Sequence, residues 1–294
     1  MAEAGRLEEP ILRGLAIDGA EVLVLPNEES VAREAARRTV EGLRSALEAR
    51  GVAHLALTGG SSAIPLYRDL SAGEWRHAIN WSDVHMWWGD DRFVPRDHPE
   101  SNAGLAYRLL FDVAAHSGES GDGAEAVEVL AGDAPGLPID PDKVHPIEIE
   151  EAIARGAPAE WAAQRYAEDL ERWLPHDASG APVFDVFLTG VGPDGHTLSV
   201  FPGSPALAAD APMVMAVPAP THVEPHLARV TLSARVLPAA GLVIVMASGA
   251  AKSEVIAQVL GAERDPERWP ARAAILPNAL WLLDAEAAAG LPLG

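Results

Sequence analysis

Cysteine is absent from the 294-residue sequence. This absence excludes disulfide bonds, thiolate nucleophiles and thiolate metal sites. It is typical of a protein kept in a reducing compartment. The N-terminal stretch MAEAGRLEEP is polar and acidic, unlike a secretory signal. We therefore expect a cytoplasmic protein.

Long apolar runs and positive charges are also scarce. The longest apolar stretch, Ala239–Ala251, is interrupted by glycine and serine and is shorter than the about 20 residues that span a bilayer. The sequence has 22 Lys and Arg against 43 Asp and Glu, which gives a formal charge of −21. This balance disfavours nucleic acid and membrane as partners. An anionic substrate would need basic side chains gathered at one place.

Apolar residues make up 48% of the sequence, enough for a sizeable core. Short apolar runs alternate with helical patterns, and no internal repeat is visible. This alternation predicts an α/β sandwich with a mostly parallel sheet. We expect residues 1–20 to be a loose lead-in. The predicted strands are Glu21–Leu25, His54–Leu57, Val84–Trp88, Val183–Leu188, Met213–Val217, Leu227–Leu232, Leu242–Ala247 and Leu280–Leu283.

Helices are predicted between these strands. Asn27 is a typical N-cap, and Gly51 is a typical stop, for the first of them. From Asp112 to about Pro158 the composition shifts to Ala, Gly, Pro, Asp and Glu, which predicts a surface excursion rather than a second domain. We therefore expect a single domain over residues 1–294. The other predicted helices are Pro65–Leu70, Ser101–Leu110, Trp161–Trp173 and Lys252–Leu260.

A glycine-rich turn follows the apolar run at Val183–Leu188. The turn spans residues 190–195, GVGPDG, and His196 comes directly after it. Glycine removes the Cβ that would keep backbone N–H groups away from a ligand. Ligands bind at strand ends in open α/β sheets, so this imidazole is a candidate functional group. Many glycine turns are plain connections, but the hydroxyls of Thr197 and Ser199 just beyond this one favour a site.

Other strand ends also carry polar or basic residues. The loop at residues 58–62, TGGSS, leads from a strand into a helix and can present N–H donors and hydroxyls to a phosphate, or it is an ordinary turn. Residues 90–92, Asp-Asp-Arg, are either site residues or a solvated loop with a local ion pair. Arg229 and Lys252 suit a phosphate, although each could be a surface charge.

Two further kinds of site find no support in the sequence. The ten histidines include no pair at metal-binding spacing with a carboxylate, so zinc is disfavoured. No Gly-x-Ser-x-Gly elbow is present, which disfavours a serine hydrolase triad.

Seven segments, taken in order, resemble the 6-phosphogluconolactonase family of the pentose phosphate pathway. The resemblance covers most of the chain, and the order of the segments makes it specific. It implies a three-layer fold like that of glucosamine-6-phosphate deaminase, with a modified Rossmann-type sheet and no metal or organic cofactor. The segments are Leu57–Ser62, Trp88–Pro95 with Ser101-Asn102, Gly190–Thr197, Phe201–Gly203, Arg229–Leu232, Gly249–Lys252 and Trp281–Asp284.

The sequence departs from the family pattern at three places. Asp91 stands where the family usually has glutamate, and Ala63 stands where proline usually follows the hydroxyl pair. The segment at 112–158 is longer than usual. These changes retain Arg92 and His196, but they leave the role of Asp91 open.

The resemblance implies hydrolysis of 6-phospho-D-glucono-1,5-lactone to 6-phospho-D-gluconate, a carboxylic ester hydrolysis. We expect His196, held by Asp194 or a backbone group, to be the general base on water, because histidine titrates near working pH. We expect Arg92 to stabilise the oxyanion, while Asp90 either touches the substrate or orients Arg92. The predicted substrate- and phosphate-binding residues are Gly59, Gly60, Ser61, Ser62, Gly192, Arg229 and Lys252.

Two alternatives remain open. An aminosugar-phosphate isomerase or deaminase of the same fold would have glutamate in place of Phe201 and an Asp-Glu-Tyr loop in place of residues 90–92. A non-catalytic sugar-phosphate sensor would usually carry a helix-turn-helix region, and none is apparent. We therefore expect a monomeric enzyme whose partner is a small phosphosugar lactone.

Overall fold

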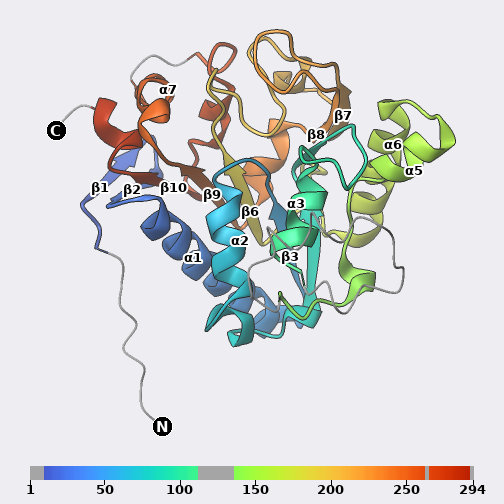
Figure 1. Ribbon diagram of the computed structural model, residues 1–294, viewed down its shortest axis with the longest axis horizontal. Coiled ribbons are helices and arrows are strands. Elements are labelled where there is room, and N and C mark those ends of the chain that lie inside the picture. Colours follow the sequence, from blue (N-terminus) through green and yellow to red (C-terminus); the bar gives the residue numbers. More distant parts are fainter. Residues whose placement is uncertain (1–9, 112–135, 262–264, 292–294) are drawn as a thin grey trace.

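The computed structural model describes residues 10–111, 136–261 and 265–291 (Figure 1). Within these residues a seven-stranded sheet has the order β1-β2-β10-β9-β6-β3-β4. Its neighbouring strands are parallel, except that β1 pairs antiparallel with β2 at one edge. The strands are β1 Arg13–Ile17, β2 Ala20–Leu25, β3 Ala53–Leu57, β4 Val84–Trp88, β6 Val186–Gly190, β9 Leu242–Ala247 and β10 Ala279–Asp284.

Helices flank this sheet (Figure 1), and for that reason its central strands are buried along nearly their whole length. The longest, α1 (Glu28–Arg50), contacts β2, β3, β6, β9 and β10. It begins where Asn27 Oδ1 accepts a hydrogen bond from Ser30 N at 2.9 Å, and it ends at Gly51 in the left-handed conformation. The predicted α/β sandwich with a mostly parallel, modified Rossmann-type sheet is confirmed. The other α-helices described are α2 Ala63–Ser71, α3 Asn102–Leu109, α5 Ile149–Arg155, α6 Ala159–Trp173 and α7 Ser253–Val259.

A second sheet has three antiparallel strands in the order β5-β8-β7. They are β5 Asp90–Arg92, β7 Val214–Val217 and β8 Arg229–Leu232. The sequence predicts β7 and β8 as strands, but it does not predict the sheet that they form. It also predicts a loop at residues 90–92, which is wrong because this segment pairs along its length with β8.

Helix α6 makes contacts with both sheets. It packs against β7 and β8, and its Tyr166 hydroxyl donates to Trp88 O at 2.9 Å and accepts from Trp88 N at 2.8 Å. Tyr166 is fully buried, as expected of a packing residue, whereas Trp173 at the end of the same helix is 42% exposed. None of the helices that the structure describes is long and apolar enough to cross a membrane.

The predicted loose lead-in at residues 1–20 is wrong in its described part, and residues 1–9 lie outside the described residues. Residues 13–17, which fall within the expected loose lead-in, form the edge strand β1, whose register pairs Arg13 with Val24 and Ile17 with Ala20. The short turn between β1 and β2 brings the two strands into this pairing.

The predicted surface excursion at 112–158 is only partly described, because residues 112–135 lie outside the described residues. The remaining part is not confined to the surface. Leu137 and Ile147 are buried in the core. Val144 forms a parallel bridge with Met86 of β4, so this segment extends the edge of the main sheet.

Candidate active site

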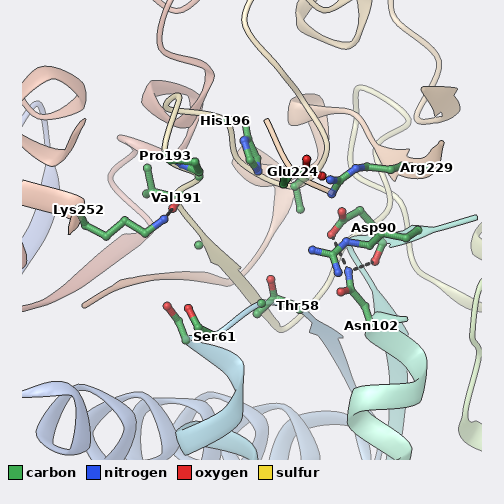
Figure 2. Close-up of a pocket in the computed structure, with 17 residues that line it drawn as sticks. Thr58, Ser61, Asp90, Asn102, Val191, Pro193, His196, Glu224, Arg229 and Lys252 are labelled. Atoms are coloured by element: carbon green, nitrogen blue, oxygen red, sulfur yellow. Dashed lines mark hydrogen bonds between the residues drawn. The ribbon is translucent and has the colours of Figure 1, made fainter. Parts of the chain in front are cut away.

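A cavity of about 300 Å³ opens at the carboxyl ends of four adjacent strands of the main sheet (Figure 2). β3 leads into the loop at 58–62, β4 into Asp90, β6 into the turn at 190–195, and β9 toward Lys252. The predicted meeting of these strand ends is confirmed, because all four segments line the cavity. The lining residues are Thr58, Gly59, Gly60, Ser61, Ser62, Asp90, Arg92, Asn102, Gly190, Val191, Gly192, Pro193, His196, Leu198, Glu224, Arg229 and Lys252.

The imidazole of His196 faces this cavity and is held from behind by Asp194. His196 Nδ1 lies 2.5 Å from Asp194 Oδ1, and His196 N donates to the same oxygen at 3.2 Å. A carboxylate accepts hydrogen bonds, so Nδ1 carries the proton in this pair and Nε2 is left with its lone pair free. The arrangement therefore presents a proton acceptor to the cavity.

Asp194 is ionised in this arrangement. Burial raises its pKa, but the hydrogen bonds and charge of His196, together with a hydrogen bond from His222, outweigh burial and hold the pKa well below its usual range. His222 Nε2 lies 2.8 Å from Asp194 Oδ2. Asp194 does not line the cavity itself, so its action on a substrate passes through His196.

Asp90 lies on the cavity wall and is almost fully buried. Ser199 Oγ donates to its Oδ2 at 2.5 Å, and Asn102 Nδ2 donates to its Oδ1 at 3.3 Å and to its backbone oxygen at 2.9 Å. The two alternatives for Asp90 were contact with the substrate or orientation of Arg92. Its partners are Ser199 and Asn102, so the position on the wall favours the first.

Asp91 points away from the cavity and caps α3. Its carboxylate accepts from the backbone N–H groups of Arg92 at 2.7 Å, Asn102 at 2.6 Å and Ala103 at 2.9 Å. Burial raises the pKa of Asp91 to about 6, although these backbone hydrogen bonds oppose the shift. A carboxylate at a helix N-terminus is stabilising, so the role left open by the sequence is structural.

Arg92 and Arg229 lie side by side in the second sheet, where they are paired in register on the neighbouring strands β5 and β8. Arg92 Nη1 donates to Glu100 O at 2.7 Å and to Glu100 Oε2 at 3.1 Å. Arg229 is 2% exposed, and burial lowers its pKa. It donates to Pro225 O at 3.2 Å, while its Nε has no hydrogen-bond partner within the described residues. A buried guanidinium with spare donors is suited to an anionic ligand.

Lys252 enters the cavity from the other side. Its Nζ donates to Val191 O at 2.6 Å, and burial lowers the pKa of its ammonium group. Figure 2 shows Lys252 and Arg229 on opposite sides of the cavity with His196 between them. The cationic groups predicted from separate strand ends therefore surround one cavity.

The loop at 58–62 forms the lower wall in Figure 2, below His196. A Cβ at Gly59 would lie 1.7 Å from Asn102 Oδ1, so only glycine permits this approach of the loop to α3. Gly60 has a φ of 80°, which also favours glycine. Ser61 and Ser62 line the cavity and lead directly into α2. The predicted phosphate loop thus has the expected strand–loop–helix geometry.

Two residues near His196, one on the cavity wall and one behind it, are not predicted from the sequence. Glu224 lines the cavity, and His222 reaches Asp194 from the same loop, between β7 and β8. Nothing in the spacing of this loop relates it to His196. The only available sign is its concentration of ionisable groups, His-Val-Glu-Pro-His, within a proline-rich connection. No cluster of three or more metal-ligand residues is found in the described parts of the chain.

The ring of Phe201 packs against the imidazole of His196. Its ring centroid lies 4.7 Å from that of His196, and the Arg229 guanidinium carbon lies 5.2 Å from the Phe201 ring centre. An apolar ring therefore occupies the position at which the deaminase alternative requires a carboxylate.

Comparison with known proteins identifies the family. The sequence model described as glucosamine-6-phosphate isomerases/6-phosphogluconolactonase matches residues 26–281. The chain is 35% identical to a 6-phosphogluconolactonase of Mycobacterium bovis over 92% of its own length and 97% of that protein. It is 32% identical to one of Streptomyces coelicolor, covering 94% of this chain and 96% of that protein. The solved 6-phosphogluconolactonase of Trypanosoma brucei superposes with a TM-score of 0.74 at 26% identity, covering 94% of this chain and 100% of that one. The chain belongs to the glucosamine-6-phosphate isomerase/6-phosphogluconolactonase family.

Proposed function

We propose that this protein hydrolyses 6-phospho-D-glucono-1,5-lactone to 6-phospho-D-gluconate. The observation that carries the proposal is the His196–Asp194 pair, which faces a cavity also lined by Arg92, Arg229 and Lys252. A base and three cations around one cavity match a neutral ester joined to an anionic tail. The relatives named 6-phosphogluconolactonase support the same reaction over nearly the whole chain.

His196 is the general base. Its Nε2 takes a proton from water as the water oxygen adds to the lactone carbonyl carbon. The tetrahedral intermediate then expels the ring oxygen, which takes that proton back from the imidazolium. Asp194 keeps Nδ1 protonated and stabilises the imidazolium between the two steps. A base held in this way contributes roughly 10²–10⁴-fold to the rate.

Arg92 stabilises the negative charge that develops on the carbonyl oxygen. Glu100 holds one end of its guanidinium through two hydrogen bonds, which fixes the plane of the group. A donor fixed in place before the reaction stabilises a developing oxyanion without reorganisation at that moment.

The 6-phosphate is bound between Lys252 and the loop at 58–62 on one side and Arg229 on the other. Lys252 then exchanges the Val191 carbonyl for a phosphate oxygen, which its flexible side chain allows. Gly59, Gly60 and Gly192 bring backbone groups close to the ligand, and Ser61 and Ser62 add hydroxyls. These contacts to the phosphate hold the lactone ring next to His196.

The deaminase alternative has less support. Ring opening of an aminosugar phosphate needs an acid beside the imidazole, and Phe201 fills that place. A sensor without catalysis would not need an imidazole held by an ionised carboxylate inside its ligand cavity. A direct assay of lactone hydrolysis distinguishes the proposed function from the deaminase and from the sensor.

The assay generates the lactone with glucose-6-phosphate dehydrogenase and follows its disappearance with and without this protein. We expect faster loss with the protein, and we expect His196→Ala to remove most of this acceleration. His176→Ala is the matched control, because His176 pairs with Glu171 and does not line the cavity. A lactone lifetime that the wild-type protein does not shorten would favour the sensor.

We also propose that residues 1–294 act as one domain, as a cytoplasmic monomer, and without a metal or organic cofactor. The cavity draws its residues from both sheets of one chain, which supports a monomer as the functional unit. Light scattering at working concentration tests the monomer.

Treatment with a chelator tests the absence of a metal. We expect unchanged activity, and a loss of activity that added metal restores would overturn the metal-free mechanism.

A further inference from the structure

Asp194 connects two histidines rather than one. Its Oδ1 lies 2.5 Å from His196 Nδ1, and its Oδ2 lies 2.8 Å from His222 Nε2. Each carboxylate oxygen therefore has its own imidazole partner. His196 faces the cavity, whereas His222 does not line it. The second imidazole is thus placed to act on the carboxylate and not on a ligand.

His222 is held in this position by more than one contact. It lies in the loop between β7 and β8, 28 positions along the chain from Asp194. Its ring stands edge-on to Phe201, with 5.9 Å between the centroids and 86° between the planes. Phe201 in turn packs against His196 at 4.7 Å. The two imidazoles, the carboxylate and the aromatic ring form one closed group of contacts.

A carboxylate with one oxygen in water can turn about its Cβ–Cγ bond and lose its alignment with a partner. A donor on the second oxygen fixes the plane of the carboxylate, as neighbouring hydrogen bonds do for ligands and bases in other sites. The side chain of Asp194 is 17% exposed and that of His222 is 49% exposed, so His222 covers Asp194 on the solvent side. The pair is therefore well placed to orient His196.

We propose that His222 is a positioning residue for the lactone hydrolysis and that it acts through Asp194 on His196. This inference rests on the proposed function. It assigns the loop between β7 and β8 a role in the chemical step in addition to closing the cavity with Glu224. His222 donates Nε2–H to Asp194 Oδ2 and leaves Oδ1 to His196.

The test uses the full chain, enzymatically generated lactone and two substitutions at one position. His222→Leu keeps an apolar contact with Phe201 but removes the donor. His222→Gln keeps an N–H donor on a side chain of similar reach. Each is also made in an Asp194→Ala background, so that a double-mutant cycle reports whether the two residues act together.

We expect His222→Leu to lower kcat about tenfold, the loss of one hydrogen bond to a charged group, with KM within about twofold of wild type. His222→Gln should recover kcat to within about threefold of wild type. In the Asp194→Ala background, His222→Leu should change kcat by less than about twofold. Thermal unfolding midpoints should agree among the variants, because His222 is half exposed.

Two results would overturn the inference: an equal loss of kcat with and without Asp194, or an unchanged kcat in His222→Leu accompanied or not by a rise in KM. A rise in KM with kcat unchanged would mean that His222 serves ligand binding or loop structure. Failure of the proposed function is distinguishable, because wild-type protein would then leave the lactone lifetime unchanged before any variant is compared.

Discussion

Gly192 lies against the ring of His196. A Cβ at Gly192 would stand 2.0 Å from His196 Cε1 and 2.1 Å from Nδ1, much closer than carbon atoms can approach. Gly192 N also donates to His196 O at 2.8 Å, so the two residues cannot easily move apart. Glycine at this position therefore decides where the imidazole lies.

We predict that Gly192→Ala lowers kcat by about 10²-fold or more, because the added methyl group must displace His196 from Asp194. Steady-state kinetics on the lactone measures the effect. Gly14→Ala is the matched control, since its Cβ would meet only Leu23 Cδ2 at an ordinary 3.8 Å. Equal kcat values for Gly192→Ala and wild type would contradict the role given to the ring position.

We predict that Lys252→Met raises KM for the lactone and weakens inhibition by inorganic phosphate, each by about tenfold or more, because a charge-assisted contact to phosphate is lost. Lys143→Met is the matched control, because Lys143 is the other of the two lysines in the sequence and donates to Ser82 O outside the cavity. Unchanged phosphate inhibition in Lys252→Met would place the phosphate elsewhere.

We predict that the protein loses stability as the pH falls from about 6.5 toward 4. Burial lowers the pKa of His54 to about 3 and of His145 to about 4, with neighbouring histidines adding to the shift, and burial also lowers the pKa of His85. In the unfolded chain these groups take up protons near pH 6.5, so acid favours unfolding. Asp91, whose pKa is raised to about 6, favours the folded state as the pH falls, but this one group opposes three histidines. Urea unfolding at pH 8, 6 and 5 measures the trend.

The control for this prediction is His145→Phe. The substitution keeps a ring stacked on Trp87, where the centroids now lie 4.0 Å apart, but removes one titrating group and its 2.8 Å contact with His85. Its stability should fall less steeply over the same pH range. An identical slope in both proteins would show that the histidine cluster does not cause the acid sensitivity.

We predict that Asp91→Asn lowers the free energy of unfolding by about 1–2 kcal/mol, because the amide replaces an oxygen that caps α3 with a donor. Its kcat should remain within about threefold of wild type, since Asp91 does not line the cavity. Asp97→Asn, on an exposed turn nearby, should leave stability unchanged. If Asp91→Asn abolished activity without loss of stability, Asp91 would belong to the catalytic machinery.

Much of the main sheet can be predicted from local signals. Asn27, Gly51 and the helical spacing between them define α1, and the apolar runs before the glycine turns define β3 and β6. The second sheet cannot be predicted in this way. β5 has only three residues, two of them acidic, and its strand geometry comes from pairing with β8, far along the chain.

Some residues of the candidate site can likewise be predicted from local sequence, and others cannot. His196, Lys252 and the glycine residues can be predicted because each lies within a few residues of the carboxyl end of a strand. His222 cannot, because only the return of the loop after β7 brings it to Asp194. The apolar residues of 136–158 are also hard to predict, because Leu137 and Ile147 are scattered in a stretch rich in Pro, Asp and Glu.

The account depends most on His196 as the base that acts on the bound lactone. The direct measurement compares wild type and His196→Ala in two assays, kcat for the lactone and the calorimetric Kd of 6-phosphogluconate. We predict that kcat falls by roughly 10²–10⁴-fold while Kd changes by less than about threefold, because the imidazole serves the chemical step and the cations serve binding. A kcat for His196→Ala equal to that of wild type would contradict the account.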